Sequence, residues 1–458
     1  MTIDTSASES PFAFKKAALP VAVCFAVAAI YTLVLYYPFP RHDHWYIVTM
    51  MQASAADTLT FQDFFELHGG HWHASGYFIM VPLAQLTGFS HLAEVIASLA
   101  LAVLGYIGLV RILMQQAKDL SVTTHLVGLF ACAAFFFFSV DQSENWLWGW
   151  QVAVFASTCG AIWAIERLTA APLTPLNVML AAIGAAISIY GFATGWALIP
   201  LGFGLLLLRQ AYKDVGGLLS LLVWTVFSAL ILWHFFLAQA AVNVPFTSDA
   251  PPTGNAFEVA FRLVTYAINY VTSPVVRFST DISIQFFFVS MGVLGWALYL
   301  LFRQKPDVLT RLLPALALCG YAFGAGMVTG LGRLEQFGSD TAFLGRYLTF
   351  GNMFWIGVLS IIFLTRAYVE NVPRRVFTGF IILACVMKIG SIGNVTQKTV
   401  PLAFEIRAAA EEMANCYPDV SAETMLFFEA PIQDVADRLK YLSDNDLSAF
   451  KIRGECDR

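Results

Sequence analysis

Long apolar runs recur along nearly the whole chain and are separated by short polar stretches. A helix that crosses a bilayer needs about 20 mainly apolar residues, and the runs predict about eleven such helices. We place them at residues 17–36, 91–114, 123–140, 151–167, 174–190, 193–208, 216–238, 284–302, 311–330, 346–365 and 376–394. The two runs that flank the turn at residues 190–195 are short, so ten spans is the alternative count.

The composition supports the same fold class. Hydrophobic residues make up 58% of the chain and charged residues 12%, whereas an ordinary soluble domain has about 25% charged residues. A soluble core of this size could not bury that much apolar surface. The sequence therefore predicts an all-α polytopic membrane protein. We expect residues 1–394 to form the membrane domain and the polar residues 395–458 to form a small helical C-terminal domain.

The basic residues in the loops predict the orientation. The first apolar run follows Lys15 and Lys16, but it is too long for a signal peptide and lacks a small-residue cleavage site, which predicts an uncleaved first span. With the N-terminus inside, the inner segments hold thirteen basic residues and the outer loops, without the tail, hold five. Basic residues collect on the cytoplasmic side. We therefore expect the loops 37–90 and 239–283, and the tail, to be exported.

The tail carries most of the charge imbalance. From Lys398 onward it has twelve acidic and seven basic residues, which accounts for the formal net charge of −5 and argues against nucleic acid as a partner. Five of the seven cysteines lie in apolar runs, where we expect them to pack as small hydrophobic residues. Cys416 and Cys456 lie in the tail, where they could form a disulfide if the tail is exported.

The first predicted exported loop contains an unusual concentration of ionisable residues. Residues 41–44 read Arg-His-Asp-His and residues 66–73 read Glu-Leu-His-Gly-Gly-His-Trp-His, so this loop holds five of the eight histidines. Ionisable residues gathered at a membrane surface indicate a functional site. The alternative is an ordinary solvated loop with histidines at the membrane interface.

Two kinds of chemistry suit this loop. A carboxylate can act as general base on an acceptor hydroxyl, and Asp43 and Glu66 are the candidates. Histidine together with carboxylate can also hold a divalent metal such as Mg, Mn or Zn, with His68 and His73 as candidate ligands. The spacing of these histidines is not a specific zinc signature, so both interpretations stay open.

Two further motifs lie at predicted outer turns. Residues 143–151 read Ser-Glu-Asn-Trp-Leu-Trp-Gly-Trp-Gln, which fits a sugar or lipid-headgroup surface or, equally, an interfacial tryptophan belt. Residues 345–347 read Gly-Arg-Tyr, with Arg333 nearby. Arginine suits bidentate binding of phosphate, although a single interfacial arginine is more often a snorkelling anchor. We interpret Lys388, inside the last predicted span, as another snorkelling side chain near the outer face.

The whole layout resembles the GT-C superfamily of integral-membrane glycosyltransferases. The segments 41–45, 66–73, 143–151 and 345–347 look like those of a poorly characterised bacterial branch of it. The resemblance implies a catalytic acidic residue in the first exported loop, which here is Asp43, with Glu66 as a second acidic residue or a metal ligand. Many members carry a paired acidic motif in this loop, whereas Asp43 is flanked by histidines. The substrate-binding residues that we expect on this basis are His44, His71, Glu144, Asn145, Trp148, Arg333, Arg346 and Tyr347.

The resemblance also implies an activity. The chain would move a sugar from a lipid-linked, polyprenyl-phosphate donor to an envelope glycan or lipid, for example lipopolysaccharide, with inversion and on the periplasmic face of a bacterial inner membrane. Asp43 would be the base and Arg346 would stabilise the departing phosphate. The alternatives are a transporter or flippase, and an assembly partner of an envelope complex. Transporters often carry inverted repeats and midplane charges, and the sequence shows no clear repeat and few such charges.

Overall fold

The computed structural model describes residues 9–117, 123–242, 254–277, 279–370, 372–428 and 435–456. Its helices and strands are α1 (Glu9–Leu35), α2 (Trp45–Ala55), β1 (Leu67–His68), β2 (His71–Trp72), α3 (Ala74–Thr87), α4 (His91–Gln116), α5 (Thr123–Phe137), α6 (Ser143–Leu147), α7 (Val152–Thr169), α8 (Pro175–Gly191), α9 (Leu198–Leu208), α10 (Val215–Val242), α11 (Ala256–Thr272), α12 (Thr280–Gln304), α13 (Leu313–Phe337), α14 (Leu348–Tyr368), α15 (Arg374–Cys416), α16 (Ala422–Phe427) and α17 (Val435–Asp444). The protein is therefore almost entirely helical.

Each predicted span corresponds to an apolar helix. Over the described residues, eight helices are long and apolar enough to cross a membrane. The predicted runs at 123–140, 174–190 and 193–208 correspond to shorter apolar helices of 10 to 17 residues. The chain is thus a multi-pass membrane protein of the predicted class.

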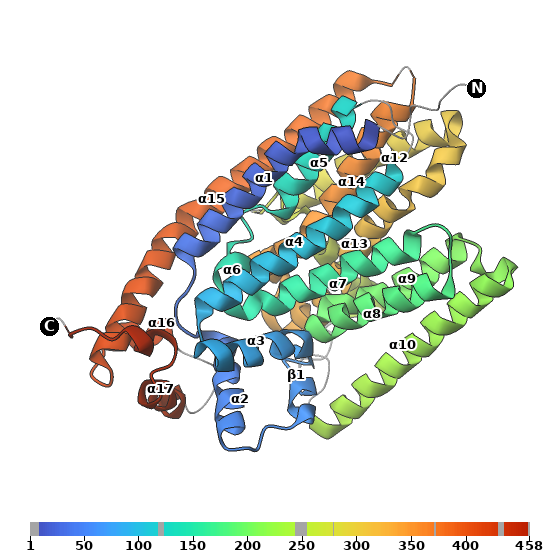
Figure 1. Cartoon of the computed structure of the whole chain (residues 1–458). Helices are drawn as coiled ribbons and strands as arrows, with labels where there is room; N and C mark the ends of the chain where they lie inside the picture. The colour runs from blue at the N-terminus through green and yellow to red at the C-terminus, as the bar shows by residue number, and fades with distance from the viewer. Residues whose placement is uncertain are drawn as a thin grey trace.

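The buried helices pack around α7 and α14. In the most apolar 18-residue stretch of each helix, all residues of α14 and 83% of those of α7 are buried. In α1 and α10 the corresponding shares are only 17% and 28%. Figure 1 shows α10 as the outermost helix on one side of the bundle. A helix that is apolar all round and poorly covered by protein is suited to face lipid. The exposed apolar side chains of α1 and α10 are therefore suited to contact lipid.

Small residues allow α7 and α8 to approach closely. A Cβ on Gly160 would lie 2.4 Å from the carbonyl oxygen of Gly184, and a Cβ on Gly184 would lie 2.8 Å from that of Gly160. Such close backbone contact is typical of helix pairs in membranes, where packing replaces the hydrophobic effect as the force between helices.

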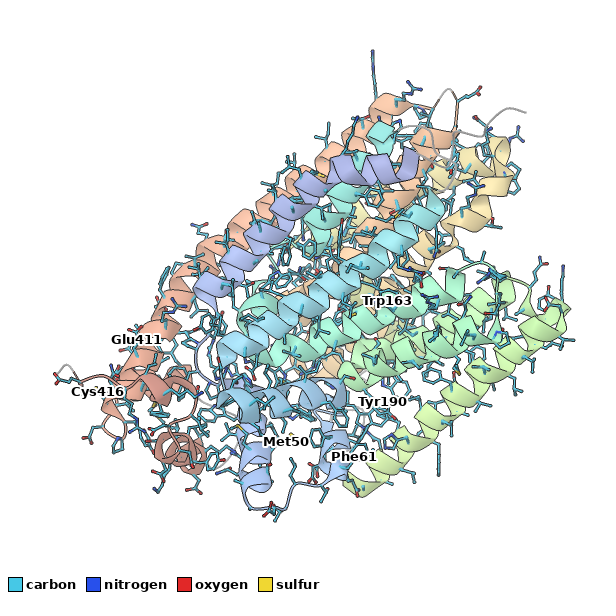
Figure 2. The ribbon with its side chains drawn as sticks, in the orientation of Figure 1. Met50, Phe61, Trp163, Tyr190, Glu411 and Cys416 are labelled. Atoms are coloured by element: carbon cyan, nitrogen blue, oxygen red, sulfur yellow. A yellow bond between two sulfur atoms is a disulfide. The ribbon has the colours of Figure 1, made fainter. Side chains whose placement is uncertain are left out.

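One end of the bundle carries the first loop. Helices α2 and α3 lie across this end, joined by a hairpin in which His68 pairs with His71. The turn is formed by Gly69 and Gly70, whose φ angles are +58° and +83°, as a two-residue hairpin turn of this hand requires. Figure 2 shows Met50 and Phe61 in this region, at the same end of the molecule as Glu411 and Cys416.

Helix α15 continues well past the last predicted span. It has 43 residues and, at about 1.5 Å per residue, is about twice as long as the roughly 30 Å hydrocarbon core. The predicted boundary at residue 394 therefore falls inside a continuous helix. Figure 1 shows α15 running beside α1 and ending next to α16 and α17.

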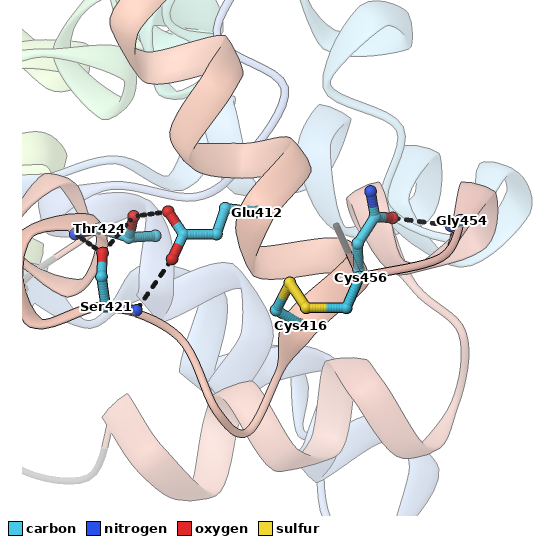
Figure 3. Close-up of a disulfide and its surroundings, with 7 residues drawn as sticks. Glu412, Cys416, Ser421, Thr424, Gly454 and Cys456 are labelled. Atoms are coloured by element: carbon cyan, nitrogen blue, oxygen red, sulfur yellow. Dashed lines mark hydrogen bonds between the residues drawn. A yellow bond between two sulfur atoms is a disulfide. The ribbon is translucent and has the colours of Figure 1, made fainter. Parts of the chain in front are cut away.

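The tail folds back onto the first loop and is closed by a disulfide. Cys416 is bonded to Cys456 (Figure 3), the pairing that the sequence left open. The indole of Trp45 donates a 2.9 Å hydrogen bond to the carbonyl oxygen of Phe428, and Arg41 Nε donates one of 2.9 Å to that of Phe427. The tail is therefore part of the structure around residues 41–45.

Our interpretation of Lys388 as a snorkelling side chain is wrong. It is fully buried and does not snorkel: its Nζ lies 2.8 Å from Asp141 Oδ2 and 2.9 Å from Asn352 Oδ1. Ser391 and Ser139 also donate to the two carboxylate oxygens of Asp141. Asp141 is 247 residues away in the chain, so no local pattern indicates this pair. Burial of a charge is tolerated where a partner and further hydrogen bonds satisfy it.

Candidate functional site

A cavity of about 420 Å³ lies where several helices end near the first loop. We call it the basic cavity. Four cationic side chains and one carboxylate line it. The lining residues are Tyr37, Arg41, His42, Ser143, Glu144, Trp148, Arg277, Phe343, Gly345, Arg346, Asn394, Val395, Lys398, Thr399 and Leu402. They come from five separate segments of the chain, so the excess positive charge is a product of the fold.

The two turn motifs that the sequence singled out meet in this cavity. Arg346 Nε lies 3.1 Å from Glu144 Oε1, and the backbone N–H of Arg346 donates to Glu144 Oε2 at 3.2 Å. Asn145 donates to the carbonyl oxygen of Arg346 at 3.0 Å and to Thr349 at 2.8 Å. Asn145 is fully buried, so it positions the arginine turn and does not face the cavity. Trp148 lines the cavity wall beside His42, with the two ring centres 5.9 Å apart.

Two other arginines are held by neutral groups. Arg277 donates to the carbonyl oxygens of Asp141 and Phe343, at 3.4 and 2.9 Å, and Arg41 donates to that of Phe427. Burial lowers the pKa of both guanidinium groups. A carbonyl oxygen fixes an arginine in place without neutralising it, so the cavity keeps charge to offer to an anion.

A second cavity, of about 360 Å³, lies between α2, α3 and the hairpin. We call it the acidic cavity, because Asp63 and Glu66 line it. Burial and the charge of Asp63 raise the pKa of the Glu66 carboxyl. The other lining residues are Tyr46, Thr49, Met50, Ala53, Thr58, Leu59, Leu67, His68 and Tyr77.

Asp43 lies between a residue that lines the basic cavity and one that lines the acidic cavity, and it is not itself in either lining. It follows His42, which lines the basic cavity, and its Oδ1 lies 3.3 Å from Nε2 of His68, which lines the acidic one. Its side chain is 32% exposed. Burial acts to raise the pKa of Asp43, but the contact with His68 and the charge of Arg346 outweigh it and hold the pKa below its usual value. Asp43 is therefore an ionised, partly exposed carboxylate.

The residue before Asp43 has an unusual backbone. His42 has a φ of +47°, in the left-handed region that non-glycine residues rarely occupy. Residues held in such conformations cluster at functional sites, where the surrounding structure fixes them.

His71, in strand β2 of the hairpin, and His73, just after it, are buried. Burial, with the charge of Arg333, lowers the pKa of His71 to about 3, and burial beside His71 lowers that of His73 well below its usual value. Both rings are therefore neutral at physiological pH. Arg333 packs over the ring of Phe337, 5.1 Å from its centre, and Tyr347 is buried against Tyr270. None of these four residues lines either cavity.

Among the described residues, one group of histidine and carboxylate side chains lies close enough together to hold a metal ion, and the sequence analysis did not indicate it. The expected ligands His68 and His73 are not in it. The set is His44, His91 and Glu94, all buried, with ligand atoms within 4.8 Å of one another. This group could hold a metal ion, and His44, which we expected to bind substrate, is fully buried within it.

Sequence reasoning missed part of the basic cavity. Arg277 was counted only as a loop charge and Lys398 as a tail charge, and their chain positions carry no motif. Arg41 belongs to the motif at residues 41–45 but was given no role of its own. The one usable signal was that all three, with Arg346, flank predicted helix ends on the same side of the membrane.

No protein-family model, no curated protein and no solved structure matches this chain.

Proposed function

We propose that the protein is a membrane glycosyltransferase that uses a polyprenyl-phosphate sugar and transfers the sugar to a hydroxyl acceptor on the exported face. The observation that carries the proposal is the basic cavity beside an ionised carboxylate, Asp43. A lipid-linked sugar phosphate has an anionic group, an apolar tail and a reactive anomeric carbon, and this end of the bundle offers a suitable surface for each.

The basic cavity suits the phosphate. Arginine presents a planar set of donors that binds phosphate oxygens in pairs, and the cavity contains Arg41, Arg277 and Arg346 as well as Lys398. Since Glu144 is the one acidic residue in the lining, the cavity has a formal excess of three positive charges. Leu402 on α15 also lines the cavity and is 37% exposed, which gives the apolar tail a path along this helix.

In the transfer step, Asp43 and the cationic side chains of the basic cavity have different roles. Asp43 accepts the proton of the acceptor hydroxyl as its oxygen attacks the anomeric carbon. The bond from that carbon to the phosphate oxygen breaks, and polyprenyl phosphate leaves with the electron pair. The cationic side chains stabilise the charge that develops on the phosphate. A single displacement of this kind inverts the anomeric centre. His68 positions the Asp43 carboxylate.

The acidic cavity suits the acceptor. Carboxylates accept hydrogen bonds from hydroxyl groups, and Asp63 and Glu66 face this space. Glu66 thus binds the acceptor, and Asp43 is the base, because Asp43 alone of the two adjoins the basic cavity. We give His68 and His73 no metal, since the convergent ligand set lies elsewhere.

The location in the cell is part of the proposal. The disulfide between Cys416 and Cys456 favours an oxidising compartment for the tail, and the basic loop residues favour the opposite end for the cytoplasm. Both support a site on the periplasmic face of a bacterial inner membrane, with envelope glycan or lipid as the acceptor class.

The test is the variant Asp43→Asn in purified protein, assayed for sugar transfer from polyprenyl-phosphate donors to envelope lipids. We expect transfer to fall by at least about 100-fold, since general-base catalysis contributes about 10²–10⁴-fold. The matched control is Asp57→Asn, in the same loop. Asp57 is exposed and has a φ of +55°, which asparagine accommodates, so transfer should not change. Unaltered transfer by Asp43→Asn would remove Asp43 as the base.

A flippase for the same lipid is the second candidate, and the buried pair of Lys388 and Asp141 favours it. Ionisable residues inside a membrane domain often mark a transport path. Liposomes that contain the wild-type protein and a fluorescent polyprenyl-phosphate sugar separate the two functions. Movement of the lipid between leaflets without any transfer product would favour the flippase.

A further inference from the structure

A second group of ionisable residues lies behind the catalytic loop and takes no part in the proposed transfer. His44 follows Asp43, and His91 and Glu94 lie in the first turn of α4. Their side chains are 0 to 2% exposed. His44 Nε2 lies 3.1 Å from Glu94 Oε1, and His91 Nδ1 lies 3.2 Å from Glu94 Oε2.

The carboxylate of Glu94 lacks the compensation that a buried charge requires. Among the described residues no Lys or Arg pairs with it; its ionic contacts are the two histidines. Glu94 Oε2 and His91 Nδ1 lie 3.2 Å apart, and among the described residues neither has a hydrogen-bond partner of good geometry. Two buried polar atoms therefore adjoin one another without a well-formed hydrogen bond. A cation bound by both would satisfy them.

The geometry and the ligand types fit zinc. Zinc binds histidine nitrogen and carboxylate oxygen at about 2.0–2.2 Å, so ligand atoms of a tetrahedral site lie about 3.3 Å apart. The two histidine–glutamate separations are 3.1 Å to Oε1 and 3.2 Å to Oε2, close to that value, and one ligand atom from each residue lies within 4.8 Å of the others. Magnesium and calcium prefer sites made of oxygen ligands, whereas imidazole suits zinc. Two histidines and one glutamate occur as the three protein ligands of catalytic zinc sites, with solvent in the fourth position. Here the set is buried and apart from the proposed transfer, so we assign the same ligand set a structural role.

The surroundings provide the outer contacts of such a site. The second ring nitrogen of His91 lies 3.1 Å from Ser448 Oγ, and ligating histidines commonly bind a partner through that second nitrogen. Ser448 belongs to the tail and donates its backbone N–H to the carbonyl oxygen of Gly88 at 3.0 Å. On the other side, a Cβ at Gly149 would lie 2.1 Å from Glu94 Oε2. Glycine at this position is what leaves room for the carboxylate.

We propose that His44, His91 and Glu94 bind one Zn²⁺ ion, with a solvent molecule as the fourth ligand, and that this ion fixes the first loop to α4. The ion is structural: it holds the short helix His42–His44, and with it Asp43, against the N-terminus of α4. The proposal is independent of the proposed glycosyl transfer, because metal content and stability are measured without donor or acceptor.

The test is metal analysis of the full-length protein, expressed with zinc and purified through a tag that contains no histidine. We expect about one zinc per chain in the wild type, and a loss of most of it in Glu94→Gln and His91→Asn. His234→Asn is the matched control: His234 contacts Tyr190 on another face, and this variant should keep its zinc. A metal-free wild type that takes up no added zinc, or a Glu94→Gln variant that retains full zinc, would overturn the proposal.

A second measurement covers variants that fail to fold. The wild type is treated with a strong chelator, and its thermal unfolding is compared before treatment, after treatment and after zinc is restored. A ligand that binds only the folded state raises the melting temperature, so we expect a fall of several degrees that zinc, but not magnesium, reverses. No shift in either direction would contradict a bound ion and would leave an ordinary buried ion pair.

Discussion

The basic and acidic cavities lie at the same end of the bundle and differ in how their charges are arranged. In the basic cavity, Arg41 and Arg277 are fixed by neutral carbonyl oxygens, so their positive charge stays available. In the acidic cavity, Asp63 and Glu66 lie close enough that Asp63 helps to raise the pKa of Glu66. One cavity is thus suited to an anion and the other to hydroxyl groups. Asp43, between them, is where an attacking oxygen and a departing phosphate would meet.

This contrast is useful because each cavity can be altered while the other is left intact. If the two hold donor and acceptor, changes in one should affect the KM for the donor alone, and changes in the other the KM for the acceptor alone. The following predictions test that separation.

The largest effect is expected beneath the basic cavity, from Lys388→Met. It leaves the Asp141 carboxylate buried without its cation, which costs about 3–5 kcal/mol of stability when one partner of a buried pair is removed. Denaturant unfolding in detergent would measure the loss. The double variant Lys388→Met/Asp141→Leu should recover most of it, since a buried pair replaced by apolar residues is often neutral. A double variant as unstable as the single one would mean that the cavity depends on more than this pair.

The next effect is on donor binding. Arg277→Gln removes one charge-assisted bond to phosphate, worth about 1.5–3 kcal/mol, and should raise the donor KM by about 10- to 100-fold with the acceptor KM unchanged. Arg262→Gln is the control, because Arg262 pairs with Glu335 outside both cavities. Equal changes in both KM values would show that the cavities do not act separately.

Glu66→Gln should act on the acceptor. Loss of one accepted hydrogen bond, about 0.5–1.5 kcal/mol, predicts a rise of about 2- to 10-fold in the acceptor KM and no change for the donor. The pH dependence follows from the raised pKa of Glu66. As pH falls through that pKa the carboxyl becomes protonated and loses accepting capacity, so the wild-type acceptor KM should rise on acidification. Glu66→Gln should lack this rise, and a variant that retains it would assign the titration to another group.

The smallest effect is expected from Lys398→Gln. Lys398 is exposed on α15, so water and salt screen its charge. We expect about a two- to threefold rise in the donor KM at low salt, which disappears at high salt. The control is Lys440→Gln, because Lys440 lies in the tail and pairs with Asp444. This variant should show no rise in the donor KM at either salt concentration.

The sequence predicts the helices far better than the site. Apolar runs of spanning length are local, and each of the eleven placed in this way corresponds to a helix. Residues of the short motifs around Asp43, Glu144 and Arg346 lie together at one end of the bundle, around the basic cavity. Contacts between distant residues could not be predicted in this way. Lys388 was misread because its partner is far away in the chain, and Glu94 was overlooked because a carboxylate at the start of an apolar run resembles an ordinary boundary residue.

The contacts between the tail and residues 41–45 have a consequence for how the protein is made. Trp45 and Arg41 are translated hundreds of residues before Phe427 and Phe428, whose carbonyl oxygens they bind. The loop around Asp43 therefore reaches its final form only when synthesis and membrane insertion are almost complete. Under the proposed function, a half-made chain would therefore have no complete site at which to consume the lipid-linked donor.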